Sequence, residues 1–490
     1  MKDVNVYSAV RWSAVAKYGA QAVDFVTSII VARLVMPEAY GLMSMALVLI
    51  GFLSILQSLG FGPAIIQRKT ISQALLSTLF IANLVLSLAM VVVVAGAAPL
   101  FGWIYRDQRV TWVMLALTVQ FVLNSFGLVP NALLTRKMRF GALAAVDIAA
   151  ALVRLVVAIG LAYRGWEVWA LVWSSAISAA AQSLCLWIAA HWRPRLWFRY
   201  KHLRNVIGFS SGITGVSVLA YLGWSSGNFI IGALLGAAAL GPFSIACRLM
   251  FFPKEAIGDV VLRVFFPVFS RCQDNHQELG SVFLKVMEAI ALVAFPCVFG
   301  LVAVAPTMID WLLGPKWNEA VPVMYGLTGI ALVSLVLPVA NHLYMAKGRT
   351  GPLFGWAVAR FLAMVAATAV GCYWGTPGVA IAWSVATVLT GLPNLSSALS
   401  FVQGLRSIHL AQRLFPYILS AAFMCASVVV LAAFLREAQV PSRTTVLLSV
   451  AAGVVIYAIL ITATRPASVL LLLRLLWMPA GDNRQPQVSL

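Results

Sequence analysis

The chain has 490 residues, of which 62% are hydrophobic and only 10% are charged, and its formal net charge is +19. Soluble domains are about half apolar and a quarter charged, so this composition excludes a water-soluble fold. In a soluble protein such a positive net charge would indicate binding to nucleic acid. In a membrane protein it is explained by the basic residues that collect in the cytoplasmic loops. We therefore expect membrane lipids around the chain and no nucleic-acid partner.

Hydrophobic runs bounded by charged residues or by Gly and Pro predict fourteen membrane-spanning helices. A run of roughly 20 apolar residues crosses the hydrocarbon core, where the backbone finds no hydrogen-bond partner outside the helix. The polar stretch Met1–Arg11 precedes a first run without a small-residue cleavage site, so we expect a retained span and not a signal peptide. The predicted spans are 13–35, 41–66, 75–100, 111–134, 142–163, 167–190, 207–235, 241–269, 282–308, 320–345, 352–373, 376–402, 414–435 and 444–464.

Lys and Arg are distributed unequally over the loops between these spans. One alternate set of loops, from Arg68 and Lys69 to Arg406 and Arg413, holds 16 basic residues, and the opposite set holds six. The positive-inside rule places the richer set, and with it both termini, in the cytoplasm.

An internal repeat occurs at an offset of 200 residues, where six of the 17 positions of Ile30–Ala46 are identical in Ile230–Ala246. Because spans one and seven both leave the cytoplasm, the repeat is of the parallel kind and relates two six-helix lobes about an axis along the membrane normal. The predicted fold is all-α, with an N-lobe at 1–190, a basic cytoplasmic linker at 191–206, a C-lobe at 207–405, an accessory helix pair at 406–464 and a cytoplasmic tail at 465–490.

The loops between the predicted spans are too short to fold as a catalytic domain, so we expect function to lie between the helices. The six cysteines form neither a disulfide framework nor a C-x-x-C metal spacing, and nucleotide-binding and metalloprotease motifs do not occur. Gly208–Gly212 matches G-x-S-x-G, but it opens an apolar helix, whereas a nucleophile elbow requires a strand before it. We expect no enzymatic activity, no catalytic residue, no metal and no cofactor.

Ionisable side chains at membrane depth are costly and usually face a cavity or a partner. The predicted spans 1, 5, 8 and 11 carry such side chains with a basic excess, which favours a polar chamber that accepts an anion. The candidate substrate-binding residues are Lys17, Arg154, Arg248, Arg263 and Arg360. The candidate coupling or cavity carboxylates are Asp24, Asp147, Glu255 and Asp259.

A purely structural interpretation of the same residues stays open. Opposite charges four or seven residues apart share a helix face, so these groups would neutralise one another between helices without binding a substrate. The groups concerned are Lys17 with Asp24, Asp147 with Arg154, and Glu255 and Asp259 with Arg263. Arg248 and Arg33 would alternatively extend to a membrane surface.

The first two spans carry a family resemblance. The stretch Arg11–Ile66 resembles the polysaccharide transporter family of the MOP flippase superfamily, in particular its colanic-acid and exopolysaccharide exporters. The residues that carry it are Ala32-Arg33-Leu34, Pro37-Glu38-Ala39-Tyr40-Gly41, Gly60-Phe61-Gly62 and Gln67-Arg68-Lys69. The resemblance continues more weakly over nearly the whole chain, without a strict motif for the basic cavity residues.

The resemblance implies a bacterial inner-membrane flippase with two six-helix lobes around a V-shaped cavity. Its substrate would be an undecaprenyl-pyrophosphate-linked oligosaccharide repeat unit, moved from the cytoplasmic to the periplasmic leaflet for exopolysaccharide, O-antigen or capsule assembly. Basic cavity residues would meet the pyrophosphate, and a proton or sodium gradient would supply the energy. A polysaccharide polymerase and a chain-length regulator are the implied protein partners.

Two alternatives remain. The first is a multidrug cation antiporter of the same superfamily, which twelve spans and an acidic chamber would favour. The extra predicted pair of spans and the basic excess of this chain argue against it. A membrane glycosyltransferase or polymerase would need large external loops with catalytic carboxylates. A major-facilitator transporter is disfavoured because its loop signature G-x-x-x-D-R-x-G-[RK] does not occur in Gly62–Thr70.

Overall fold

A computed structural model of the chain describes the backbone of residues 6–57, 61–68, 71–195, 197–198, 200–271, 276–346, 350–401, 405 and 407–464. Side chains are described in the same ranges except for 6–17, 63–64, 67, 200–217, 256–271, 276–278, 345–346 and 350. Of the candidate residues, Lys17, Asp259 and Arg263 therefore have side chains outside the described set.

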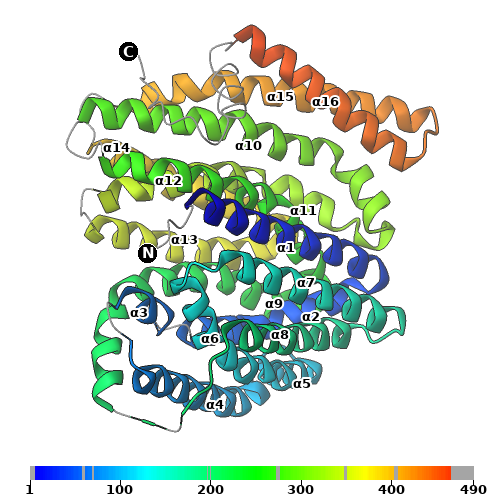
Figure 1. Cartoon of the computed structure of the whole chain (residues 1–490). Helices are drawn as coiled ribbons and strands as arrows, with labels where there is room; N and C mark the ends of the chain where they lie inside the picture. Colours follow the sequence, from blue (N-terminus) through cyan, green and yellow to red (C-terminus); the bar gives the residue numbers. More distant parts are fainter. Residues whose placement is uncertain are drawn as a thin grey trace. The chain divides into compact units, whose positions relative to one another are not determined.

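The described chain consists of helices joined by short turns (Figure 1). Two short 3-10 turns, η1 (Pro315–Trp317) and η2 (Cys372–Trp374), accompany the α-helices. The α-helices are α1 (Val6–Leu34), α2 (Pro37–Gln57), α3 (Phe61–Gln67), α4 (Gln73–Ile104), α5 (Gln108–Leu117), α6 (Val119–Arg136), α7 (Phe140–Tyr163), α8 (Val168–Ala190), α9 (Tyr200–Arg271), α10 (His276–Leu312), α11 (Ala320–Gly326), α12 (Thr328–Ala346), α13 (Thr350–Gly371), α14 (Gly375–Leu399), α15 (Ser407–Glu437) and α16 (Ser442–Thr464).

Ten of the described helical stretches are long and apolar enough to cross a membrane, or eleven when the bent pair α11 and α12 counts as one span. The chain is thus an all-helical, multi-pass membrane protein. Two of the ten stretches contain a break, at Gly236 within Val218–Glu255 and at η2 within Gly351–Leu399. The count of fourteen spans stays a prediction.

Several predicted spans are interrupted in ways that hydropathy does not detect. The predicted span 41–66 is divided between α2 and α3, and 111–134 between α5 and α6 at Thr118. The predicted spans 207–235 and 241–269 both lie in α9, which is broken at Gly236, where φ is 82°. Glycine suits this left-handed conformation because it has no Cβ. Helix α9 already begins at Tyr200, so the predicted linker 191–206 is helical at its end.

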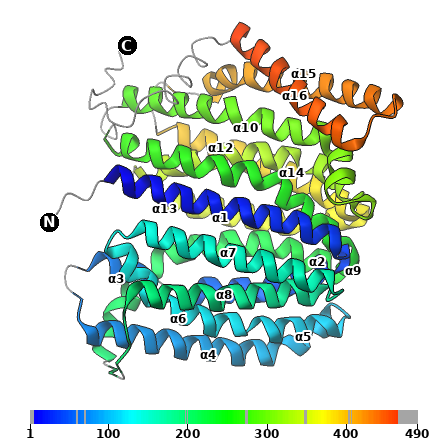
Figure 2. The same cartoon turned by 45° about the vertical axis from the view of Figure 1, so that its right-hand side comes forward.

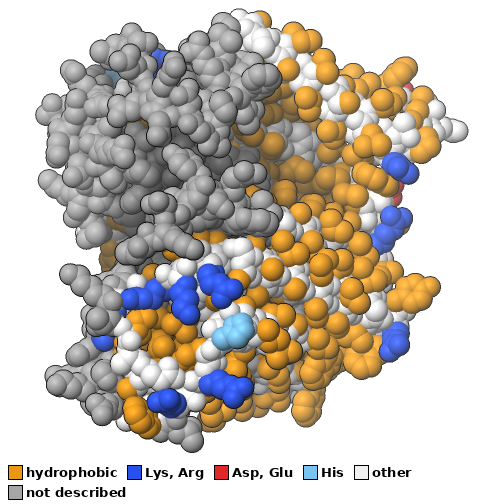
Figure 3. Space-filling view, in the orientation of Figure 1, with side chains coloured by type: hydrophobic (Ala, Val, Ile, Leu, Met, Phe, Trp, Pro, Cys, Tyr) orange, Lys and Arg blue, Asp and Glu red, His pale blue; other side chains and the backbone are white. Residues whose placement is uncertain are grey.

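The face of the protein in Figure 3 carries a broad band of hydrophobic side chains, with Lys and Arg side chains at its ends in the lower half of the view. Large apolar side chains of unit 1 are well exposed, including Val92 at 71%, Val156 at 69% and Ile188 at 64%. A water-soluble protein rarely exposes so large an apolar surface, whereas lipid favours it.

The chain divides into two compact units. Unit 1 comprises Met1–Leu249, Ile309–Ile330 and Gly351–Thr390, and unit 2 comprises Met250–Met308, Ala331–Thr350 and Gly391–Leu490. Within unit 1, α1 packs on α7, α7 on α8, α8 on α6 and α6 on α4, an order that Figure 2 shows. Within unit 2, α15 packs on α16. The lobe boundaries at 190 and 207 stay predictions.

Aromatic side chains form a cluster in unit 1, made of the buried Phe80 on α4 and Trp192 just beyond α8 and of the half-buried Phe126 on α6 and Trp187 on α8. The rings of Phe80 and Trp192 are 5.8 Å apart and edge to face, a favoured aromatic geometry. The Trp192 indole N–H donates to Gln73 Oε1 at 3.0 Å, which satisfies its polar group inside the cluster.

The two segments of the repeat, Ile30–Ala46 and Ile230–Ala246, contact each other at two glycines. A Cβ atom on Gly41 would overlap the backbone carbonyl of Ala237, and a Cβ atom on Gly241 would overlap the backbone carbonyl of Pro37. Residues 37 and 41 correspond to 237 and 241 at the offset of 200, so the contact is reciprocal. A twofold axis produces such a pair of matched contacts.

Gly41→Ala and Gly241→Ala should each destabilise the protein, because the helices must separate to admit the methyl group, at a cost of about 1–3 kcal/mol. Gly160→Ala is the control, since its Cβ would meet nothing within 4 Å and alanine is the better helix former. Thermal unfolding in detergent, followed by tryptophan fluorescence, measures both effects. A Gly41→Ala protein as stable as the Gly160→Ala protein would contradict the close contact.

Candidate functional site

A polar cavity of about 420 Å³ lies within unit 1, among α1, α2, α6, α7, α8 and α9. Its volume falls within the range of small-molecule sites. The lining residues are Asp24, Thr27, Ser28, Val31, Tyr40, Met43, Ser44, Leu47, Gln120, Arg154, Ala158, Leu171, Ser174, Ser175, Ser244, Ile245 and Arg248. We call it the charged cavity.

The charged cavity contains an ion pair between two helices. Arg154 Nη1 on α7 lies 2.9 Å from Asp24 Oδ1 on α1. Both side chains keep contact with the open space, with 41% of the Arg154 side chain and 32% of the Asp24 side chain accessible. Among the described residues, Nε of Arg154 has no hydrogen-bond partner. The guanidinium therefore retains unused donor capacity beside its carboxylate.

A second guanidinium reaches the same place from α9. Arg248 Nη2 donates to the backbone carbonyl of Asp24 at 3.2 Å, which leaves its charge without a carboxylate in this contact. The lining thus holds two guanidiniums and one carboxylate. An excess of positive charge in a membrane-embedded cavity favours an anionic ligand, because isolated charges are costly there.

Hydroxyl groups cover the rest of the polar wall. Thr27 and Ser28 lie three and four residues after Asp24 on α1, a spacing that places all three on one helix face. Ser174 and Ser175 face the cavity from α8, where Gln120 of α6 donates to Ser175 Oγ. These groups donate and accept hydrogen bonds without adding charge.

The structure brings together only some of the predicted site residues. Arg154, Arg248 and Asp24 all line the charged cavity. Asp147 does not pair with Arg154, although the two share a face of α7; its Oδ1 instead accepts from Gln182 Nε2 at 3.1 Å. Seven residues span about 10 Å along a helix, so a neighbouring helix supplies the closer carboxylate.

The remaining candidates lie elsewhere. Arg360 is half-buried on α13 and lines neither of the two polar cavities described for unit 1. Glu255 is an exposed residue of α9 in unit 2. Lys17, Asp259 and Arg263 fall outside the described side chains. The roles of all nine candidates as substrate-binding or coupling groups stay predictions.

Several elements hold the turn between α1 and α2, and Val31 and Tyr40 on either side of this turn line the charged cavity. Lys316 Nζ donates to the carbonyl of Val35 at 2.8 Å, and Trp317 Nε1 donates to the carbonyl of Ala32 at 2.8 Å. Glu167 Oε2 accepts from the backbone N–H of Met36 at 3.0 Å. Arg33 donates to the carbonyl of Trp311 at 3.1 Å, so its guanidinium is engaged with the protein.

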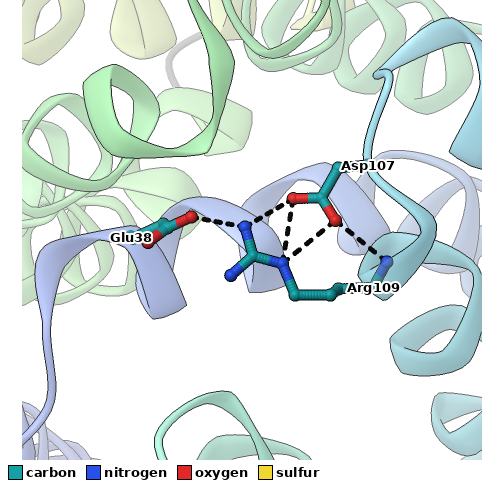
Figure 4. A network of polar contacts seen from close by, with 3 residues as sticks. All are labelled: Glu38, Asp107 and Arg109. Carbon is teal, nitrogen blue, oxygen red and sulfur yellow. Dashed lines mark hydrogen bonds and ion pairs between the residues drawn. The ribbon is translucent and has the colours of Figure 1, made fainter.

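A network of three residues also holds the start of α2 (Figure 4). The Arg109 guanidinium on α5 donates to Glu38 on α2 and to Asp107, whose Oδ2 lies 2.7 Å from Arg109 Nη2. Asp107 also caps α5, since its Oδ1 accepts from the backbone N–H of Arg109 at 2.9 Å. The hydrogen bonds from Arg109 hold the pKa of the Asp107 carboxyl below its usual range.

Sequence reasoning missed several lining residues and one pairing. Tyr40, whose hydroxyl donates to the carbonyl of Ser28 at 3.1 Å, was noted only as part of the family resemblance. The serines of α8 at 174, 175 and 178 recur at helical spacing and could have been recognised as a polar stripe. Among the described residues, no group of three or more His, Cys, Asp or Glu side chains could hold a metal ion.

Comparison with known proteins gives one family match. A model of a family described as polysaccharide biosynthesis protein matches residues 30–322, which include Ala32 to Lys69. The succinoglycan biosynthesis transport protein ExoT of Rhizobium meliloti is 27% identical over 489 residues, covering 98% of this chain and 96% of that one. The lipopolysaccharide biosynthesis protein WzxC of Escherichia coli is 25% identical over 366 residues, 74% of each chain.

Solved structures show where the fold belongs. The lipid II flippase MurJ in an inward closed conformation matches with a TM-score of 0.76 at 12% identity, covering 94% of this chain and 100% of that one. An inward-facing multidrug resistance MATE transporter of the MOP superfamily matches with a TM-score of 0.61 at 12% identity, covering 82% and 98%. At these identities the likeness concerns the fold. The family match confirms the predicted resemblance to polysaccharide transporters, and the fold is shared with solved transporters of the MOP superfamily.

The ion pair predicts a thermodynamic coupling between two helices. In a double-mutant cycle, Asp24→Asn and Arg154→Gln should couple by about 1 kcal/mol, a modest value because both side chains are partly exposed. Unfolding of the purified protein in mixed micelles measures the four free energies. The cycle of Asp24→Asn with Arg360→Gln is the control and should be additive. Equal couplings in the two cycles would contradict the pairing.

The pKa of Asp107 predicts a pH dependence of stability. A carboxyl whose pKa falls on folding stabilises the fold above its unfolded pKa of about 4, and this stabilisation is lost as the pH falls through the folded pKa. Asp107→Asn should therefore lower the thermal midpoint at neutral pH, and its difference from wild type should shrink below about pH 4. A difference that stays constant over this range would contradict the role of Asp107.

Proposed function

The chain belongs to the polysaccharide biosynthesis protein family, and on this premise we propose that it is a flippase for lipid-linked oligosaccharides. The substrate is an undecaprenyl-pyrophosphate-linked repeat unit, which moves from the cytoplasmic to the periplasmic leaflet. The product serves the assembly of exopolysaccharide, O-antigen or capsule. The chain carries this headgroup across without forming or breaking a bond in it, so it is a transporter and not an enzyme.

The arrangement of Asp24, Arg154 and Arg248 around one cavity supports this proposal most strongly. A diphosphate cannot enter hydrocarbon unaided, because removing a charged group from water is very costly. Guanidinium groups bind phosphate oxygens with paired hydrogen bonds, so two of them in a polar cavity give the diphosphate an alternative to water. The polyprenyl tail can stay in the lipid throughout.

Alternating access in this proposal uses fourteen spans, arranged as two six-helix lobes and an accessory pair. The reciprocal contacts of Gly41 with Ala237 and Gly241 with Pro37 support a twofold relation between the lobes, because each half of the repeat makes the same contact. The turn between α1 and α2, held by Lys316, Trp317 and Arg109, would close the external side. Release outward would require these contacts to open.

Asp24 is the best-placed coupling group. A proton or sodium ion on its carboxylate would weaken the ion pair and free Arg154 for the phosphate, which links the gradient to binding. Asp147, Glu255 and Asp259 are further candidates, and no cofactor is needed. In this proposal the protein lies in the bacterial inner membrane with both termini cytoplasmic, near a polymerase and a chain-length regulator.

A cation antiporter is the second candidate, because a MATE transporter shares the fold. The charged cavity argues against it, since its two guanidiniums outnumber its one carboxylate. A cation would meet repulsion there.

Deletion of the gene in its own organism should abolish the surface polysaccharide and trap completed lipid-linked repeat units on the cytoplasmic side. The wild-type chain should restore export, whereas Arg154→Gln combined with Arg248→Gln should reduce it by at least about tenfold, because the phosphate loses two charge-assisted contacts. Arg164→Gln, at an exposed arginine outside the cavity, is the matched control. Immunoblotting establishes equal amounts of each protein in the membrane.

Two outcomes would contradict the proposal. Accumulation of incomplete repeat units would point to an enzyme that builds them, and full export by the double variant would remove the phosphate site from the mechanism.

A further inference from the structure

A second polar cavity, of about 580 Å³, lies within unit 1 among α2, α3, α4, α6 and α8. None of its lining residues is charged. Its polar wall is made largely of carboxamides, namely those of Gln57, Asn83, Asn124, Asn131 and Gln182. We call it the amide cavity, and it shares no lining residue with the charged cavity.

Asn83 marks the amide cavity as a binding site. Its side chain is 1% exposed, and within the described part of the chain neither its amide nitrogen nor its amide oxygen has a hydrogen-bond partner. A buried amide without partners is costly and uncommon, and a ligand or water in the cavity can supply the missing bonds.

Two glutamines are fixed so that they present acceptors. Gln57 Nε2 donates to Ser87 Oγ at 2.6 Å and to the carbonyl of Phe121 at 2.7 Å, which uses both of its N–H groups and leaves Oε1 as the free group. Gln182 Nε2 donates to Asp147 at 3.1 Å, so Asp147 orients an amide of the wall. Asn124 and Asn131 are exposed and supply both donors and acceptors.

This combination selects a chemical class. Cationic donors favour a phosphate, and carboxylates favour a metal cation or an amine, but the lining offers neither. Sugar hydroxyls and acetamido groups both donate and accept, as carboxamides do, so each ring can match several amides at once.

The two cavities share three helices, α2, α6 and α8, and lie at different positions along them. Along α2 the lining passes from Ser44 to Ser54, and along α8 from Ser175 to Gln182. At 1.5 Å per residue these steps correspond to about 10–15 Å. On α6, Gln120 lines the charged cavity and Asn124 lines the amide cavity. On α2, α6 and α8 alike, the residues named for the amide cavity thus follow those named for the charged cavity in the chain.

We propose that the amide cavity binds uncharged sugar residues of the headgroup while the charged cavity holds the diphosphate. This inference rests on the proposed function and adds its specificity determinant. The guanidiniums recognise what all lipid-linked repeat units share, and the carboxamides recognise what distinguishes them.

Binding to the purified full-length chain in nanodiscs tests the inference with two probes, a polyprenyl diphosphate that bears a neutral disaccharide and the same lipid diphosphate without sugar. Asn83→Leu preserves shape and removes the amide. Gly62→Leu fills the cavity without removing a polar group, since a Cβ on Gly62 meets nothing within 4 Å. Gly96→Leu is the matched control, a helical glycine with equally open surroundings outside the cavity.

Asn83→Leu should weaken binding of the glycosylated probe by about five- to tenfold, the effect of roughly one lost hydrogen bond. Gly62→Leu should weaken it at least as much, because its side chain occupies the cavity. Both variants should leave binding of the bare diphosphate unaffected. Gly96→Leu should change neither affinity. Unchanged binding of the glycosylated probe, or equal weakening for both probes, would overturn the sugar site and leave the flippase proposal standing. Failure of the wild-type chain to bind either probe would overturn both proposals.

Discussion

The ion pair between Asp24 and Arg154 is the interaction on which the functional account depends. It joins α1 to α7 in a setting where an unpaired charge would be costly, and it leaves part of each side chain facing open space. A closed structural pair would satisfy all its atoms, whereas Nε of Arg154 has no partner among the described residues and Arg248 contributes a further positive charge. The carboxylate therefore neutralises only part of the local charge.

This partial neutralisation explains how a cationic cavity can exist without a ligand. With Asp24 in place the protein folds around a smaller net charge, and in the proposed function an arriving phosphate would replace the carboxylate as the partner of Arg154. The glycine contacts at 41 and 241 and the contacts of Lys316 and Trp317 fix the ends of α1, α2 and the second half of α9 around this point. Helix positions set by close backbone packing thus determine which charges meet.

The sequence predicted the helical membrane character and the family well, because long apolar runs and the stretch from Ala32 to Lys69 are local signals. It did not predict the breaks at Thr118 and between α2 and α3, since hydropathy does not respond to a bend. It placed Arg154 with Asp147 by helix periodicity, whereas the structure pairs Arg154 with Asp24. That partner depends on the packing of α1 against α7, which no local spacing encodes. The amide cavity was missed because its residues are uncharged and come from five helices.

The most direct test of the central claim is the affinity of the purified chain for a polyprenyl diphosphate without sugar, measured for wild type and Asp24→Asn. If the charged cavity is an anion site whose carboxylate competes with phosphate for Arg154, Asp24→Asn will bind the diphosphate more tightly than wild type. Weaker binding by Asp24→Asn would contradict the account, because it would make the carboxylate part of the binding site.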